Sequence, residues 1–422
     1  MKTASIGSKS TARYSTFGAV LLVIALCMLA ARIPHLVRDL HDRGPDWVGD
    51  FQYFYYAFTV AINHPSEAWI LYDGDHVIPF LHEIGMLDVS AINFYGYPPQ
   101  FAIIFSWLAS WDVSTARIIW SGMSAVCMVT AVILTLQLSY RGGNRGAFVL
   151  LAAIVILFRP TLDEMYWGQS NALLFVLLAA TFFCIERGNR YAAGLFLALA
   201  IAVKVTPMAI VGLLLLRREW RTVISTIIFS VVIAAVTAAQ FGWNVILRYY
   251  IADLWRLNKQ FSLLGGAPFN SSLKGALQTL SAASGTSMSP TALGAISTVF
   301  GLAVCLLAAY LVFKRHADPR IDYALATATM LLASPALESV HMVVVLIPLL
   351  ILVGTTLEEP QAFSGAASGS RTELVFIALS IALLMFSPKF VSYTVAVMLI
   401  YGLCVARYFP TAVFSDRGRK TA

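Results

Sequence analysis

Long apolar stretches separated by short polar connections run through almost the whole chain. Because apolar and polar residues do not alternate inside the stretches, the pattern predicts membrane helices, whereas the strands of a membrane barrel would alternate residue by residue. Several stretches are shorter than the roughly 20 residues of a full crossing, so we expect about eleven membrane elements, some of them broken or re-entrant. The stretches are 17–35, 99–111, 115–139, 146–159, 172–186, 191–203, 205–216, 222–243, 291–313, 321–333, 339–356, 373–387 and 389–407.

The composition sets the class of protein. The chain has 422 residues, of which 59% are hydrophobic and 12% charged, whereas soluble domains carry about 25% charged residues. We therefore expect an all-α polytopic protein with one integral-membrane domain over 1–422. Its two long polar regions are 36–98, with juxtamembrane helices, and 244–290, and we expect both to be extracytoplasmic loops.

The net charge of +7 does not indicate nucleic-acid binding, because basic residues of membrane proteins collect in cytoplasmic connections. With both termini placed in the cytoplasm, most of the basic connections fall on the inner side of a bacterial plasma membrane. Stretch 17–35 is then a retained anchor, and Lys204 to Pro207 forms the outer apex of a helical hairpin, broken by the proline. The five cysteines all lie in apolar stretches and are expected to be buried, with no metal site.

The same topology puts nearly all the unusual polar motifs on the outer side, where a shared cavity would explain them. They are Asp50 with its aromatic run, Tyr95 to Pro99, Trp167 to Asn171, Lys204 to Pro207, Asn270 to Lys274, and Glu338 with His341.

These motifs, in this order, resemble glycosyltransferase family 87. The resemblance rests on Asp50 followed by Tyr55-Tyr56-Ala57, on Tyr97-Pro98-Pro99, on Gly168-Gln169-Ser170-Asn171, on Lys204-Val205-Thr206-Pro207, and on Ser334-Pro335 followed by His341. It implies the glycosyltransferase C type of helical bundle and inverting transfer of mannose from polyprenyl phosphate, without a cofactor or metal. Two segments depart from the family pattern: Asn270-Ser271-Ser272 replaces Asn-Gln-Ser, and Glu338 stands where a polar or aromatic residue is expected.

Asp50 is the predicted general base. A carboxylate at a membrane surface is desolvated, which raises its basicity, and it can take the proton of an attacking hydroxyl. The alternative is that Asp50 only caps a helix starting at Phe51, and both roles can coexist. His341 is the second predicted catalytic residue, contacting the donor phosphate or orienting Asp50; it can instead simply pair with Glu338, three residues earlier.

The remaining candidates are predicted to bind substrate. Lys204 between two apolar half-helices suits a phosphate, unless it extends to the lipid headgroups. The amides of Gln169 and Asn171 suit sugar hydroxyls or cap the next helix, whereas Asp163 and Glu164 before them are expected to be solvated. The other predicted binding residues are Tyr53, Tyr56, Tyr95, Tyr97, Asn270, Lys274 and Glu338, with an interfacial aromatic belt as the alternative for the tyrosines of the Asp50 run.

The sequence thus predicts a membrane hexosyltransferase that uses a polyprenyl-phosphate sugar donor, a glycolipid or glycan acceptor and surrounding membrane lipids. Two other classes stay open. A transporter or flippase also has broken helices and intramembrane charges, but no internal repeat is visible here. A polysaccharide polymerase or ligase would favour arginines in outer loops, such as Arg248 and Arg256.

Overall fold

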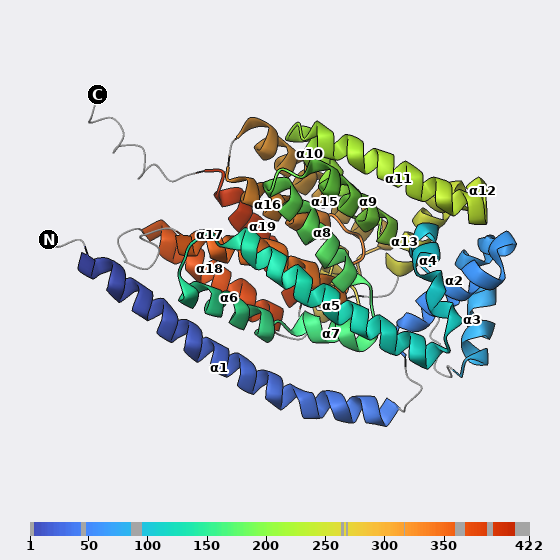
Figure 1. Cartoon of the computed structure of the whole chain (residues 1–422), viewed down its shortest axis with the longest axis horizontal. Coiled ribbons are helices and arrows are strands. Elements are labelled where there is room, and N and C mark those ends of the chain that lie inside the picture. The colour runs from blue at the N-terminus through green and yellow to red at the C-terminus, as the bar shows by residue number, and fades with distance from the viewer. Residues whose placement is uncertain are drawn as a thin grey trace.

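The computed structural model describes residues 4–43, 48–85, 95–262, 266, 269–315, 317–358, 368–385 and 391–409. Every regular element within these residues is helical (Figure 1). The elements are α1 (Ala4–Arg43), α2 (Phe51–Asn63), η1 (Pro65–Tyr72), α3 (Gly74–Glu83), α4 (Pro99–Phe105), η2 (Ser106–Ser110), α5 (Val113–Ser139), α6 (Arg145–Leu157), α7 (Arg159–Trp167), α8 (Asn171–Glu186), α9 (Arg190–Val203), α10 (Met208–Leu216), α11 (Trp220–Phe241), α12 (Trp243–Arg248), η3 (Tyr249–Asp253), α13 (Leu254–Ser262), α14 (Leu273–Ala283), α15 (Pro290–Lys314), α16 (Pro319–Leu332), η4 (Ser339–Val345), α17 (Leu346–Glu358), α18 (Ser368–Met385) and α19 (Ser392–Ala406).

Among the described residues, five helical segments are long and apolar enough to cross a membrane, and α6 with α7 makes a sixth if this pair, bent by 47°, is one span. The five are Gly18–His35, Val113–Ser139, Trp220–Phe241, Pro290–Lys314 and Ser339–Glu358, and several shorter apolar helices accompany them. The expectation of an all-helical polytopic membrane protein is confirmed for the residues described. The number of about eleven membrane elements stays a prediction.

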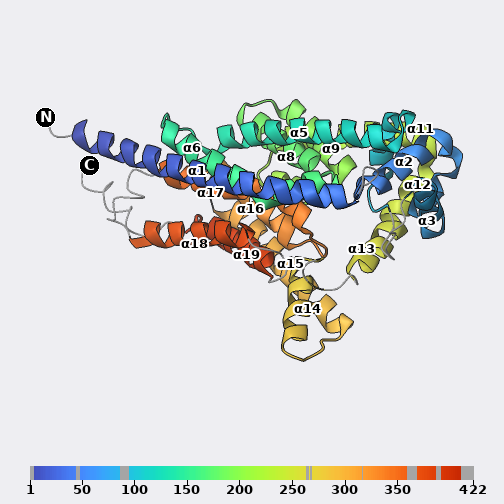
Figure 2. The ribbon, with the colours of Figure 1, turned by 90° about the horizontal axis from the view of Figure 1, so that it is seen from below.

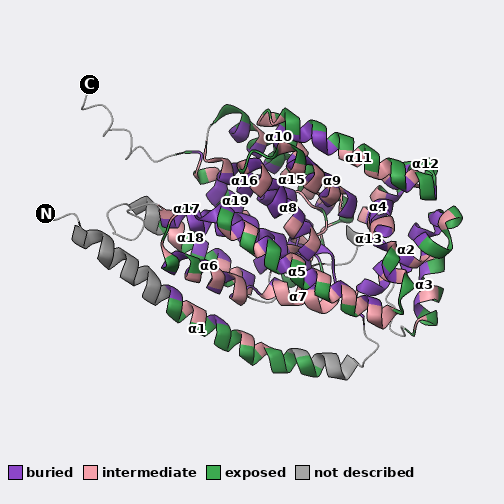
Figure 3. Ribbon diagram, in the orientation of Figure 1, coloured by how far each residue is buried: buried purple, intermediate pink, exposed green. Residues whose placement is uncertain are grey.

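The outer helices expose their apolar side chains. On α11, Ile227 and Val231 are 54% and 59% exposed, and the exposed positions of α1 and α11 stand out at the edges of the bundle (Figure 3). Such faces would be unfavourable in water but suit lipid chains. In contrast, 89% of an apolar 18-residue stretch within Ser339–Glu358 is buried, so η4 and α17 lie at the centre of the bundle.

Helix directions bring many element ends together. The first turns of α5, α8, α10 and η4 lie at one end of the bundle, where α7, α9 and α16 finish. Hydrogen bonds and a shared cleft connect these segments. The opposite ends of the same helices carry ion pairs, including Arg141 with Glu186 at 2.5 Å and Arg320 with Glu358 at 2.7 Å. Figure 2 shows α2, α3 and α12 gathered at one end of the long axis, with α6 and α18 toward the other.

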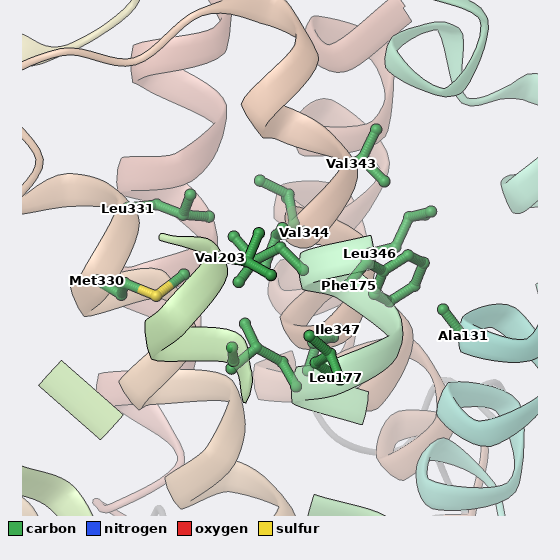
Figure 4. Packing of buried hydrophobic residues seen from close by; sticks show 14 of the residues in the cluster. Ala131, Phe175, Leu177, Val203, Met330, Leu331, Val343, Val344, Leu346 and Ile347 are labelled. Carbon is green, nitrogen blue, oxygen red and sulfur yellow. The ribbon is translucent and has the colours of Figure 1, made fainter. Parts of the chain in front are cut away.

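A hydrophobic core supports the first of these ends. Phe175 of α8, Val203 of α9 and Leu331 of α16 pack with Val344 of η4 in one cluster (Figure 4). All four side chains are less than 5% exposed. Chain segments far apart in the sequence are therefore held rigidly where their polar ends meet.

The expected burial of the cysteines needs correction. Cys27 and Cys305 are exposed on the faces of α1 and α15, whereas Cys404 is buried, because a small thiol is as stable against lipid as inside a bundle. Helix α1 continues to Arg43, into the region 36–98 for which juxtamembrane helices are expected. The structure places the helices α2, η1 and α3 in the rest of that region.

Candidate active site

Asp50 begins the site. It occupies the N-cap position of α2, yet its side chain makes no capping hydrogen bond. Its backbone N–H instead donates to the carbonyl of Trp167 at 2.8 Å, and its carboxylate accepts a hydrogen bond from Nε2 of Gln169 at 2.8 Å. The helix start predicted at Phe51 is therefore confirmed, but the carboxylate is directed at another part of the chain and does not serve as the cap.

The turn from Gly168 to Asn171 presents this glutamine. Gly168 adopts the left-handed conformation at φ 70° that ends α7, and Gln169 follows at once. Arg117 of α5 donates to the carbonyls of Met165 and Tyr166 at 2.9 and 3.1 Å, and the Trp120 indole donates to that of Gly168 at 2.9 Å. Two side chains of α5 thereby hold the last turn of α7 in place.

Tyr97 completes the first polar chain of the site. Its hydroxyl donates to Oε1 of Gln169 at 2.7 Å, so the amide of Gln169 has only its NH₂ group to offer Asp50. The ring of Tyr97 packs against Phe54 and Phe101, with centroids 4.8 and 5.1 Å away. The aromatic packing and the paired amide together fix where the carboxylate points.

Burial raises the pKa of Asp50 from 3.8 to about 6, while the hydrogen bond from Gln169 and the charge of Arg117 oppose the shift. Desolvation is the largest cause, as expected for an acid among aromatic side chains. The group is deprotonated at neutral pH and yet more basic than an ordinary aspartate. Both properties suit a general base.

A second polar chain starts at Glu164 of α7, which is only 1% exposed. One carboxylate oxygen accepts from the backbone N–H of Ala172 at 2.8 Å, and the other accepts from Nδ2 of Asn171 at 3.0 Å. Oδ1 of Asn171 accepts in turn from Nζ of Lys204 at 3.1 Å. The expectation that Glu164 is solvated is wrong, because the segment expected to be a connection is the helix α7, which turns this side chain inward.

Lys204 connects the two chains. Its backbone leaves the helical conformation just after α9, at φ −152° and ψ 139°, which confirms the predicted helix break before Pro207. Its ammonium nitrogen lies 5.6 Å from the centroid of the Tyr97 ring. The carboxylates of Asp50 and Glu164 therefore belong to one polar cluster around Tyr97 and Lys204.

A narrow cleft opens beside this cluster. It is lined by side chains from α8, α16, η4 and the segments before α10 and η4: Asn171, Leu174, Lys204, Thr206, Met330, Leu331, Ser334, Ala336, Leu337, His341 and Val344. Nδ1 of His341 accepts a hydrogen bond from the backbone N–H of Glu338 at 2.8 Å. In the neutral ring Nε2 then carries the proton and is a donor. Glu338 lies close enough to influence Lys204 and Asp50 electrostatically.

Asn270 lies at the same end but is bonded to backbone. Its Oδ1 accepts from the N–H groups of Ser272 and Leu337 at 3.0 and 3.2 Å, and its Nδ2 donates to the carbonyl of Pro335 at 3.2 Å. In this arrangement Asn270 holds the loop that precedes η4. Lys274 lies in the first turn of α14 and is 8% exposed.

The other predicted tyrosines differ in their surroundings. Tyr53 is partly exposed, and its pKa is raised mainly by burial and further by the nearby charge of Asp50. Tyr56 and Tyr95 are buried and donate to the carbonyls of Ile70 and Pro98, each at 2.9 Å. Of the predicted tyrosines, Tyr97 is joined directly to the cluster through Gln169.

Sequence reasoning missed two residues of this cluster, Glu164 and Arg117. A signal existed for each. Arg117 is a charge inside an apolar stretch, which indicates a functional position. Pro160 and Gly168 are a helix-start and helix-stop pair that could have identified α7, although not the direction of Glu164.

The model of glycosyltransferase family 87 matches residues 94–335, a segment that contains Tyr97, Gln169, Asn171 and Lys204. The chain is 29% identical over 183 residues to a polyprenol-phosphate-mannose-dependent alpha-(1-2)-phosphatidylinositol mannoside mannosyltransferase of Mycolicibacterium smegmatis. The aligned region covers 40% of each of the two chains. The chain is 25% identical over 201 residues to the protein of the same name from Mycobacterium tuberculosis, covering 44% of this chain and 45% of that one.

The chain thus spans less than half the length of both curated relatives in these matches. No solved structure matches it significantly. The family match covers more than half of the sequence and includes Glu164, Asn171 and Lys204 of the second polar chain, whereas Asp50 of the first chain lies outside it. The chain belongs to glycosyltransferase family 87.

Proposed function

We propose that this protein is an integral-membrane hexosyltransferase that moves a sugar, mannose first among the candidates, from polyprenyl phosphate to a glycolipid or glycan acceptor. The observation that carries the proposal is the carboxylate of Asp50, which bonds to Gln169 and not to its own helix. Family membership supports the reaction class over a transporter or flippase and over a polymerase or ligase. The names of the two relatives support polyprenyl-phosphate mannose as the donor and a phosphatidylinositol mannoside as the acceptor to test first.

In the proposed step, a hydroxyl of the acceptor attacks the anomeric carbon of the donor sugar. The new bond joins the acceptor oxygen to that carbon, and the bond from the carbon to the phosphate oxygen breaks. Asp50 takes the hydroxyl proton, and its elevated pKa makes it a better acceptor for that proton. Polyprenyl phosphate leaves with the bonding electron pair, and direct displacement inverts the anomeric centre.

Charge on the leaving phosphate needs stabilisation within a site of low polarity. Lys204 lines the cleft with one N–H group donated to Asn171, which leaves two for a phosphate oxygen. His341 lines the same cleft, and its Nδ1 is already bonded to Glu338, so Nε2 is its available donor. These two groups are the proposed phosphate contacts.

The distribution of charge supports an extracytoplasmic site. Basic residues are concentrated at the end of the bundle opposite Asp50, as in Arg190 paired with Glu219 at 2.9 Å. The cytoplasmic connections of membrane proteins are rich in arginine and lysine. We therefore propose that this basic end, with both termini, faces the cytoplasm and that the cleft opens on the outer side.

The test uses purified protein in lipid nanodiscs with a panel of polyprenyl-phosphate sugars and glycolipid acceptors. Release of polyprenyl phosphate that depends on one donor sugar and on added acceptor would establish the transfer and identify both substrates. Release without acceptor would indicate a hydrolase. If no donor in the panel is turned over while the protein moves lipid-linked sugar across a sealed vesicle membrane, the transporter alternative replaces the proposal.

A further inference from the structure

Glu164 stands out as a buried carboxylate that the proposed transfer step does not use. It is 1% exposed, and both of its oxygens accept hydrogen bonds from groups at the start of α8. No ion pair within 4.0 Å of Glu164 occurs among the residues that the structure describes. A buried acid that has only neutral direct partners is costly to keep, so its retention calls for a specific consequence.

That consequence lies in the orientation of Asn171, which is fully buried. A carboxylate only accepts hydrogen bonds, so Glu164 fixes the NH₂ group of Asn171 on its own side. The carbonyl oxygen of Asn171 is then turned toward Lys204, 3.1 Å away. The reversed amide would place the carbonyl against the carboxylate and the NH₂ group against the ammonium, so both contacts would become repulsive.

Lys204 needs this support because of its own position. It follows α9 in an extended conformation, and its side chain enters the cleft alongside His341. A lysine side chain has four rotatable carbon–carbon bonds and adopts one position only when its ammonium group is bound. Burial lowers the pKa of Lys204, and the charges of Glu338 and Glu164 oppose that shift. Glu164 therefore also helps to keep the ammonium group charged.

We propose that Glu164 is a positioning residue for the donor: through Asn171 it holds the Lys204 ammonium group in the cleft, where that group binds the phosphate of a lipid-linked sugar. The inference rests on the proposed function. It adds a role for the second polar chain that is distinct from the Asp50 chain, which acts on the acceptor. The two chains begin in the same turn, since Gln169 belongs to one and Asn171 to the other.

The Glu164→Gln substitution tests this role with little change in shape. Glutamine still accepts from Ala172 through its carbonyl, but its NH₂ group then faces the NH₂ group of Asn171. Asn171 is forced to turn, and Lys204 loses its acceptor. We expect the KM for donor to rise about tenfold, the value of one charge-assisted hydrogen bond, with little change in the KM for acceptor.

A second substitution should restore the pattern. In Glu164→Gln with Asn171→Asp, the new NH₂ group at 164 donates to the carboxylate at 171, whose other oxygen accepts from Lys204. We expect the donor KM to return to within about threefold of the wild-type value. If Glu164→Gln does not fold, Asn171→Ala breaks the same link while leaving the cap on Ala172 intact, and the same rise is expected.

Asp163→Asn is the matched control. This neighbouring acid lies 3.8 Å from Arg159 in the same helix and interacts with Ser339, but it does not belong to the chain of hydrogen bonds from Glu164 to Lys204. The donor KM of this variant should therefore stay at the wild-type value. An unchanged donor KM in active Glu164→Gln protein would overturn the inference and leave the transferase proposal standing. The inference would also be overturned if Glu164→Gln lowered the melting temperature and kcat and the double substitution restored neither. Glu164 would then be only a helix cap. Wild-type protein without transferase activity would overturn both proposals.

Discussion

The side-chain amide of Gln169 donates a 2.8 Å hydrogen bond to the carboxylate of Asp50, across 119 positions of sequence. Because the amide oxygen of Gln169 is occupied by the hydroxyl of Tyr97, the amide faces Asp50 with its NH₂ group only. This contact holds one carboxylate oxygen and leaves the other available to an acceptor hydroxyl. Because the carboxylate of Asp50 bonds to Gln169 and does not cap α2, its role as a base can be tested without loss of a helix cap.

Asp50→Asn should abolish transfer without loss of stability. Asparagine has the same shape, and its oxygen can still accept from Gln169, but it cannot take a proton at neutral pH. We expect kcat to fall by a factor of about 10² to 10⁴, the usual contribution of a general base. The measurement is release of polyprenyl phosphate, together with the melting temperature in lipid.

Asp112→Ala is the control for loss of a helix cap. Asp112 also precedes a helix, but its carboxylate accepts a true capping bond from the N–H of Thr115 at 2.9 Å. Removing it should lower the melting temperature and leave kcat unchanged. If Asp50→Asn instead lowers stability and retains most of its kcat, the carboxylate of Asp50 is a structural group and the base lies elsewhere.

The pH profile of transfer should follow the titration of Asp50. Its pKa is raised to about 6, and the protonated form below this value cannot accept a proton. We expect kcat/KM to peak near pH 7 and to fall about tenfold per pH unit below about pH 6. It should fall again above about pH 8, the value to which burial lowers the pKa of Lys204. Gln169→Leu removes a hydrogen bond that favours the charged form of Asp50, so the acidic limb should move to higher pH. A limb that stays at its wild-type position would show that another group titrates.

Helix starts and breaks at prolines could be predicted from the sequence, because they depend on the proline itself. The apolar stretch expected from 99 and the helix break expected at Pro207 both agree with the structure, since α4 begins at Pro99 and α10 just after Pro207. A proline restricts its own backbone and removes one donor whatever its surroundings. The shared end of Asp50, Gln169 and Lys204 was likewise expected, since topology alone alternates the helix ends.

Side-chain directions were not readable in the same way. That Asp50 bonds to Gln169, and that Glu164 turns inward, depends on how α5, α7 and α8 pack against one another. Periodicity could not show this for Glu164, because its segment was taken to be a connection. The contacts of Asn270 with Leu337 and Pro335 likewise join segments that nothing in the sequence pairs.

Lys204→Met tests the proposed phosphate contact directly. Methionine fills much of the same volume but removes the charge, so binding of the donor phosphate should weaken while the apolar packing is retained. We expect the donor KM to rise by at least tenfold, with a smaller decrease in kcat and an unchanged acceptor KM. A donor titration that is the same for both proteins would mean that Lys204 only interacts with lipid headgroups.

Gly49→Ala should disturb the site through the backbone. Gly49 has φ 60°, and a Cβ atom built there would lie 2.6 Å from the carbonyl oxygen of Trp167, the acceptor of the Asp50 N–H. The chain would have to move away from α7 and take Asp50 with it. We expect a loss of about 2 kcal/mol in stability and a marked decrease in kcat. Gly85→Ala is the control, because Gly85 also has positive φ, at 88°, but no atom of the described residues lies within 4 Å of its added Cβ. Gly85→Ala should lose stability through backbone strain only and keep its full kcat. Equal losses of kcat in Gly49→Ala and Gly85→Ala would show that the contact with Trp167 does not contribute to catalysis.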